Sequence, residues 1–113
     1  MPRPGLIACM LLAWAFNSAA EEAATVEGYA TCAAYYFNET NVTPVTAFER
    51  VYDAGEFAFN QALQQSTRAE VDKLVGDASA RMTQLMSEDW RKFDRVRARY
   101  AADCRALVGT AAP

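Results

Sequence analysis

The chain has 113 residues, with eleven Lys and Arg, fourteen Asp and Glu, and no histidine, which makes its net charge −3. This length allows one domain. An acidic chain is a poor candidate for binding nucleic acid, and a chain without histidine lacks the commonest general base and metal ligand.

Residues 1–20 have the organisation of a secretory signal peptide. Arg3 supplies positive charge, residues 6–16 form an apolar run, and small residues precede a cut after Ala20. A spanning helix needs roughly 20 apolar residues, so a retained anchor is the weaker alternative. Cys9 lies too early in the run for a lipoprotein box. We therefore expect a periplasmic or secreted protein whose mature domain is residues 21–113.

The mature chain keeps two cysteines, Cys32 and Cys104. An even pair in an exported chain favours a disulfide, with two free thiols as the alternative. The pair lacks the close spacing of zinc ligands, so we expect neither a metal nor a cofactor. Closing a loop of this length stabilises a fold by up to about 4 kcal/mol.

Apolar residues recur at helical spacing, and no segment shows sustained strand-like alternation. We expect helices over 24–37, from Pro44 or Thr46 onward, from 68 onward and over 90–108. Thr46 and Thr67 each precede a Glu by three residues, as in a capping box. The apolar register continues through residues 87–89, where a break is favoured over one long helix.

Both cysteines fall on the apolar faces of their helices. The sequence therefore predicts an all-α fold, a small bundle of three or four helices that the Cys32–Cys104 disulfide closes. Gly55 lies inside the apolar arc of the second helix, which indicates close approach of a neighbouring helix. Residues 38–44 are expected to form a loop. This loop contains two sequons, at Asn38 and Asn41, which would be glycosylated only in a eukaryotic secretory pathway.

The charge is unevenly distributed, with acids in the N-terminal half and bases in the last helix. Arg91, Arg95 and Arg99 form a basic face that could meet an anionic envelope surface or a partner, or simply face solvent. Arg97 instead falls inside the apolar arc. We expect it to reach solvent along its stem or to form a buried ion pair.

Two aromatic residues, Tyr35 and Phe57, lie opposite the apolar faces of their helices. They are expected to be exposed, and together they could form a patch for self-association or for a protein partner. The other aromatic residues are expected to pack in the core: Tyr29, Tyr36, Phe48, Tyr52, Phe59, Trp90, Phe93 and Tyr100.

No nucleophile and base can be paired with any specificity, so no catalytic residue is predicted. Glu49, Asp53 and Glu56 share one side of the second helix and could bind a divalent cation, although a solvated face is the simpler interpretation. A hydrolase or lyase that uses Asp53 and Glu56 is the enzymatic alternative.

Cys32 is followed by Tyr35 and Tyr36, and Tyr100 precedes Cys104 by four residues. This pattern resembles small exported, all-helical, two-cysteine proteins of proteobacteria. The resemblance implies export and a helical fold but carries no activity. The periplasmic acid-stress chaperones share the architecture without sharing a motif. Our leading hypothesis is a non-enzymatic binding or interaction protein, chaperone-like, inhibitor-like or envelope-associated, whose ligand the sequence does not identify.

Overall fold

The computed structural model describes residues 24–109. They form four α-helices, α2 (Val26–Glu39), α3 (Phe48–Leu63), α4 (Arg68–Leu85) and α5 (Asp94–Val108), and two 3-10 turns, η1 (Val45–Ala47) and η2 (Trp90–Lys92). The predicted all-α fold is confirmed, and Cys32 and Cys104 form its disulfide. The signal peptide predicted over residues 1–20 lies outside the described residues.

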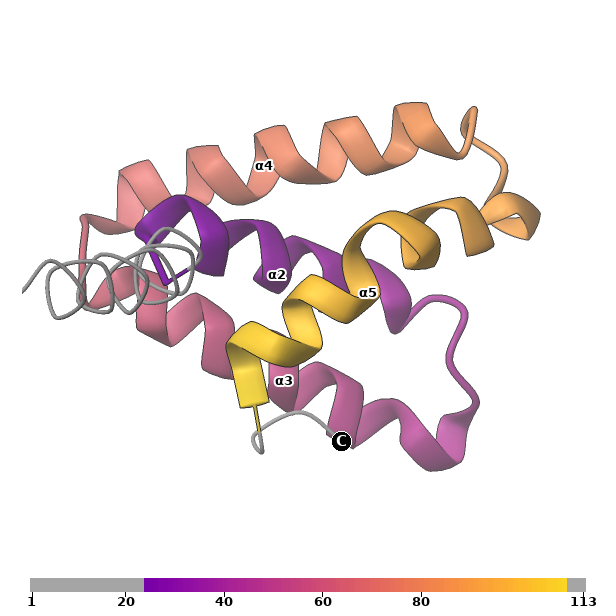
Figure 1. Ribbon diagram of the computed structural model, residues 1–113, viewed down its shortest axis with the longest axis horizontal. Coiled ribbons are helices and arrows are strands. Elements are labelled where there is room, and N and C mark those ends of the chain that lie inside the picture. Colours follow the sequence, from indigo (N-terminus) through magenta and orange to yellow (C-terminus); the bar gives the residue numbers. More distant parts are fainter. Residues whose placement is uncertain (1–23, 110–113) are drawn as a thin grey trace, which may run out of the picture.

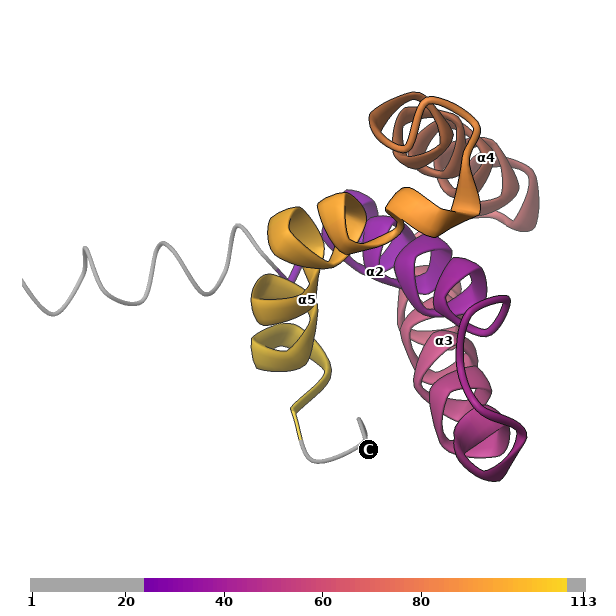
Figure 2. The same cartoon turned by 90° about the vertical axis from the view of Figure 1, so that its right-hand side faces the viewer.

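Successive helices run in alternating directions (Figure 1), as expected for short connections between them. They do not form a square bundle. Seen from the end, α2 occupies the middle, with α4 on one side of it, α3 on another and α5 on a third (Figure 2). The contacts of α3, α4 and α5 with α2 outnumber those that these three helices make with one another. The fold is therefore organised around α2.

Small side chains explain how α2 can pack against three helices at once. Alanines let two helix backbones approach closely, because their methyl groups fill little space between the axes. Seven alanines are at most 1% exposed: Ala30, Ala33, Ala34, Ala54, Ala58, Ala62 and Ala78. Three of them lie on α2 itself, and the others lie on α3 and α4.

Each partner helix meets its own side of α2. Toward α4, the Asn38 side-chain amide donates to the Ser79 hydroxyl oxygen over 3.1 Å. Toward α3, the Phe37 ring lies where a Cβ on Gly55 would stand, 2.7 Å from two ring carbons. The close approach predicted at Gly55 is therefore confirmed. Toward α5, Cys32 is bonded to Cys104.

The helix boundaries follow from local chemistry. The Thr67 hydroxyl accepts the Glu70 N–H, which confirms the predicted start of α4. Ser87 and Glu88 both adopt left-handed backbone conformations, with φ of 53° and 59°, and these end α4. The break predicted before Trp90 is thus present. Gly109, with φ of 64°, ends α5 as expected.

Three boundary predictions are wrong. The last helix, expected to begin at residue 90, begins at Asp94 and is preceded by the turn η2. Residues 38 and 39, expected in the loop, are the last residues of α2. The expected capping box at Thr46 is absent, because α3 begins at Phe48 and no side chain caps it. The turn η1 precedes α3 instead, and the Thr43 hydroxyl donates to the Glu39 carbonyl oxygen over 2.7 Å. The loop is therefore hydrogen-bonded to the last turn of α2, and its side chains do not cap α3.

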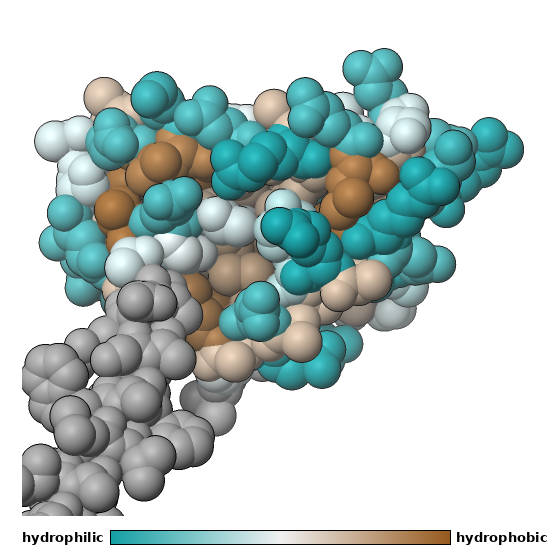
Figure 3. Space-filling model, turned by 45° about the horizontal axis from the view of Figure 1, so that its top comes forward, coloured by the Kyte–Doolittle hydropathy of each residue, from teal (hydrophilic) through white to brown (hydrophobic). Residues whose placement is uncertain are grey.

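None of the helices within residues 24–109 is both long enough and apolar enough to cross a membrane. The face that carries α4 shows separate hydrophobic patches with hydrophilic side chains between them, rather than one apolar band (Figure 3).

Replacing Gly55 with Ala is expected to destabilise the fold, in contrast to the same change at Gly76. Alanine favours a helix by about 1 kcal/mol over glycine, but at Gly55 the added methyl group overlaps the Phe37 ring. Such overpacking costs about 1–3 kcal/mol. Gly76 has no atom within 4 Å of its Cβ position. The free energy of unfolding, measured by urea denaturation, should therefore be higher for Gly76→Ala than for wild type. It should be lower for Gly55→Ala than for Gly76→Ala. Equal stabilisation by both changes would contradict the packing described for α2 and α3.

Removing the disulfide is expected to lower the free energy of unfolding by about 2–4 kcal/mol, because the bond restrains a long loop in the unfolded chain. The two cysteines are 72 positions apart. The measurement is urea denaturation of wild type and of the Cys32→Ala/Cys104→Ala variant, each with and without reductant. Reductant should shift only wild type. If oxidised and reduced wild type unfold at the same urea concentration, the bond contributes nothing.

Candidate functional site

A row of four aromatic side chains runs along one side of α3. We call it the aromatic row; its members are Phe48, Tyr52, Phe37 and Phe59. Phe48 stacks on Tyr52 with ring centroids 6.0 Å apart, Tyr52 lies 5.6 Å from Phe37 of α2, and Phe37 lies 6.5 Å from Phe59. Phe48 and Tyr52 are 44% and 41% exposed, and Val45, just before them, is 92% exposed. Within the described residues, only one other large hydrophobic side chain, Trp90, is as exposed.

The aromatic row borders an open groove of about 320 Å³ between α3 and α4. Its walls are a mixture of aromatic and polar side chains: Phe37, Tyr52, Glu56, Phe59, Asn60, Arg68 and Asp72. The Arg68 guanidinium lies 5.1 Å from the centre of the Phe59 ring and also pairs with Asp72 at 3.1 Å. The groove therefore has an aromatic floor with charged groups at its edges.

The prediction that Phe48, Tyr52 and Trp90 pack in the core is wrong. The side of α3 that faces α2 is lined by small residues and Val51: Val51, Ala54, Gly55, Ala58 and Ala62 are all buried. Because these let the two helices come close together, the larger rings are left at the flank of the contact. Trp90 stacks on Phe93 at 6.1 Å but lies at the outer end of η2.

The exposure predicted for Tyr35 and Phe57 is also wrong. Tyr35 is 2% exposed and packs against Phe93, just before α5, and Tyr100 of α5, with centroids 6.1 and 6.5 Å away. It is buried because α2 is covered on three sides and has no broad face toward solvent. Phe57 is half-buried against the edge of the core. The two residues therefore form no joint surface patch.

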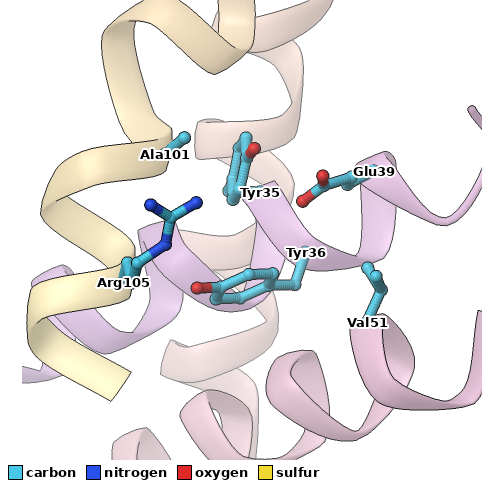
Figure 4. A pocket seen from close by; sticks show the side chains of 6 residues that line it. All are labelled: Tyr35, Tyr36, Glu39, Val51, Ala101 and Arg105. Atoms are coloured by element: carbon cyan, nitrogen blue, oxygen red, sulfur yellow. The ribbon is translucent and has the colours of Figure 1, made fainter. Parts of the chain in front are cut away.

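A second, smaller pocket of about 80 Å³ lies between α2, α3 and α5. We call it the polar pocket; it is lined by Tyr35, Tyr36, Glu39, Val51, Ala101 and Arg105. The Arg105 guanidinium and the Glu39 carboxylate enter it from opposite sides, and the two tyrosine rings lie between them (Figure 4). The sequence pattern does not predict that these residues lie together.

The phenol groups of the polar pocket are held in their neutral form. Burial, and then the nearby Glu39 carboxylate, raise the pKa of Tyr35 well above its usual range. The same two causes raise the pKa of Tyr36, although the Arg105 charge opposes them. In the aromatic row, a hydrogen bond with Glu56 raises the pKa of Tyr52. The tyrosines therefore remain hydrogen-bond donors rather than phenolate bases at neutral pH.

Arg97 forms an ion pair, but not the buried one that the sequence allowed. Its Nη1 lies 2.8 Å from Asp94 Oδ1, its Nε lies 3.7 Å from Glu39 Oε1, and its guanidinium lies 5.0 Å from the Phe93 ring centre. The Arg97 side chain is 40% exposed. Of the two arrangements predicted for Arg97, the structure has the first: its charge reaches the surface beside the Phe93 ring, and a buried pair is not formed. The Glu39 pair joins α2 to α5.

The basic face is exposed, as expected, but two of its three members have neighbours. Arg91 donates from its backbone and from its guanidinium to Asp89, and these bonds lower the pKa of the Asp89 carboxyl. The Arg99 guanidinium lies 5.6 Å from the Tyr100 ring centre. Arg95 is exposed on α5. Local pairs of this kind are worth little in free energy and leave the charges accessible.

The helix α3 carboxylates do not converge. Glu49, Asp53 and Glu56 are all exposed, and only Glu56 lines a groove. Across residues 24–109, no three Cys, Asp or Glu side chains are grouped so that they could hold a metal ion. Of the two carboxylates of the hydrolase or lyase alternative, Glu56 lines the groove between α3 and α4, and Asp53 does not.

No protein-family model matches the chain, and neither a curated protein nor a solved structure matches it. The aromatic row and the polar pocket are therefore interpreted from their own chemistry.

The stability of the protein is expected to fall as pH rises above about 10, the usual pKa of tyrosine. A phenol whose pKa is higher in the folded state than in the unfolded state stabilises the fold at pH values below its unfolded-state pKa. This stabilisation is lost as the pH rises from the unfolded-state pKa toward the folded-state pKa. Tyr35, buried beside Glu39, should make the largest contribution. Urea denaturation across the alkaline range should show a steeper loss in wild type than in Tyr35→Phe. Parallel losses in the two proteins would contradict this assignment.

Proposed function

We propose that this protein is an exported, non-enzymatic binding protein that holds a partner protein on its aromatic row. The single observation that carries the proposal is the clustering of exposed apolar side chains. Val45 lies in η1, just before α3, and Phe48 and Tyr52 lie one turn apart at the start of α3. These three account for all the large exposed hydrophobic residues of the described chain except Trp90. A contiguous exposed apolar surface of this kind is typical of an interaction site.

The charges beside the aromatic row favour a particular partner chemistry. Glu49, Asp53 and Glu56 form a stripe along α3 next to the aromatic rings, and Asp72 faces them from α4. Arg68, which pairs with Asp72, is the only cation lining the groove. We infer a partner segment that carries apolar side chains with Lys or Arg beside them. Such a pairing would give specificity and speed of association more than affinity.

Two features support export. The disulfide requires an oxidising compartment in most organisms, and residues 1–20 have the sequence pattern of a signal peptide. In a bacterium this compartment would be the periplasm, where a chaperone-like, inhibitor-like or envelope-associated role is compatible with a binding surface of this size.

The test is a photo-reactive amino acid placed at Glu49, beside the aromatic row, in the native host. Cross-linking should yield an adduct of one discrete mass. Once the partner is purified, the Phe48→Ser/Tyr52→Ser variant should bind it at least about tenfold more weakly, because truncated central aromatics carry much of the binding energy. These side chains are exposed, so the fold should be unaffected.

Trp90→Ser is the matched control, since Trp90 is equally exposed but lies on η2. It should bind the partner as wild type does. If Trp90→Ser weakens binding as much as the double variant, the aromatic row is not the site. An adduct with twice the mass of the chain would assign the row to self-association instead.

A further inference from the structure

The polar pocket is built from two facing helix surfaces. Cys32, Tyr35, Tyr36 and Glu39 are spaced so that they share one face of α2, and Ala101 and Arg105 are one turn apart on α5. Ala101 is the reason for the cavity, because its methyl group leaves open the space that a longer side chain would fill.

The disulfide holds the two walls of the pocket in register. Arg105 directly follows Cys104, and Tyr35 and Tyr36 lie one turn beyond Cys32. The bond brings the two cysteine Cα atoms to 5.3 Å. Arg105 is thereby placed against Tyr36 without an ion pair of its own: no carboxylate within residues 24–109 lies within salt-bridge distance of it.

The two walls of the pocket have opposite chemistry. On the α5 wall the Arg105 guanidinium donates hydrogen bonds and carries positive charge, and the hydroxyl of Tyr36, which reaches toward it from α2, is a further donor. On the α2 wall the Glu39 carboxylate accepts hydrogen bonds. Arg97, 3.7 Å from Glu39, offsets its negative charge. Arg97 is itself paired with Asp94 at 2.8 Å, so the charged groups that line the pocket are Glu39 and Arg105, one of each sign. The pocket therefore favours a ligand that has an anionic group for Arg105 and a donor group for Glu39.

The size of the pocket limits the ligand. A volume of about 80 Å³ has room for a few water molecules, and hence for a ligand with only a handful of non-hydrogen atoms. The planar fork of an arginine pairs with carboxylates and phosphates through two parallel hydrogen bonds, and a carboxylate is the smaller of these two groups.

We propose that the polar pocket binds a small 2-amino or 2-hydroxy carboxylate. The ligand's carboxylate would accept hydrogen bonds from Arg105 and the Tyr36 hydroxyl, and its amino or hydroxyl group would donate to Glu39. The Tyr35 ring and Ala101 form the walls on either side. The site is separate from the aromatic row and does not depend on the protein partner proposed there.

The test is a titration of the oxidised, isotope-labelled protein followed by NMR, with glycine and glycolate as probes. Both should shift the backbone resonances of residues 35, 36, 101 and 105 in a saturable manner. Acetate has no donor beside its carboxylate, and methylammonium has no carboxylate. Each should bind at least about tenfold more weakly, as expected when one hydrogen bond to a charged group is lost.

Three variants locate the ligand. Ala101→Leu fills the pocket and should abolish the shifts, and Arg105→Gln should weaken binding at least about tenfold. Arg105 is exposed, so its replacement tests the site even if Ala101→Leu disturbs the packing. Arg95→Gln removes an exposed arginine from the same helix and should bind as wild type does. Reductant should weaken binding, because α5 is then no longer held against α2.

The proposal is overturned if neither probe gives a saturable shift, or if the shifts survive both Ala101→Leu and Arg105→Gln. It is also overturned if acetate binds as tightly as glycine and glycolate, because Glu39 would then take no part in recognition. Equally tight binding of inorganic phosphate would overturn it as well, because the pocket would then not select a carboxylate.

Discussion

The fold depends on the close packing of α2, whose alanines let three helices reach one central helix. In a square bundle of four helices each helix has two neighbours and one face toward solvent. Here α2 has three neighbours (Figure 2) and is almost entirely covered, whereas α3, α4 and α5 each carry many exposed side chains. Bulky residues at Ala30, Ala33 or Ala34 would force the partners apart. The small side chains therefore determine the arrangement more than the large ones do.

Both candidate sites follow from this arrangement. The helices α3, α4 and α5 make few contacts with one another, so the spaces between them are only partly filled. The groove beside the aromatic row occupies the space between α3 and α4, and the polar pocket lies where α2, α3 and α5 meet. Side chains of α2 contribute to both, Phe37 to the first and Tyr35, Tyr36 and Glu39 to the second. Two different surfaces are thus built on one rigid support.

Helical spacing, the two cysteines and the capping residues were enough to predict the fold class, the disulfide, the start of α4 and the break before Trp90. They were not enough to predict which aromatic residues are buried. A helical wheel assumes that each helix has one buried face, and this assumption fails for α2, where Tyr35 is covered although it lies opposite the apolar arc. It fails again for α3, where the arc holds both the buried Gly55 and the exposed Tyr52. The packed face there is the stripe of small residues, a signal that is visible in the sequence but carries little weight on a hydropathy scale.

The polar pocket could not be predicted from the pattern of any single helix, because its walls come from segments about 70 residues apart. The pairing of Cys32 with Cys104 could have placed Arg105 beside Tyr36, since each residue lies within one turn of a bonded cysteine. The cavity itself depends on the distance between the helices.

The position of the disulfide also has a consequence for the order of events during biogenesis. Its two cysteines lie in the first and the last described helices, with α3 and α4 between them. A chain that crosses a membrane with its N-terminus first exposes the Cys32 thiol long before Cys104 arrives. In that interval the thiol is open to mixed disulfides with other proteins. In a chain exported as proposed above, the native bond forms only after all four described helices have emerged, so oxidation is a late step that follows delivery of α5.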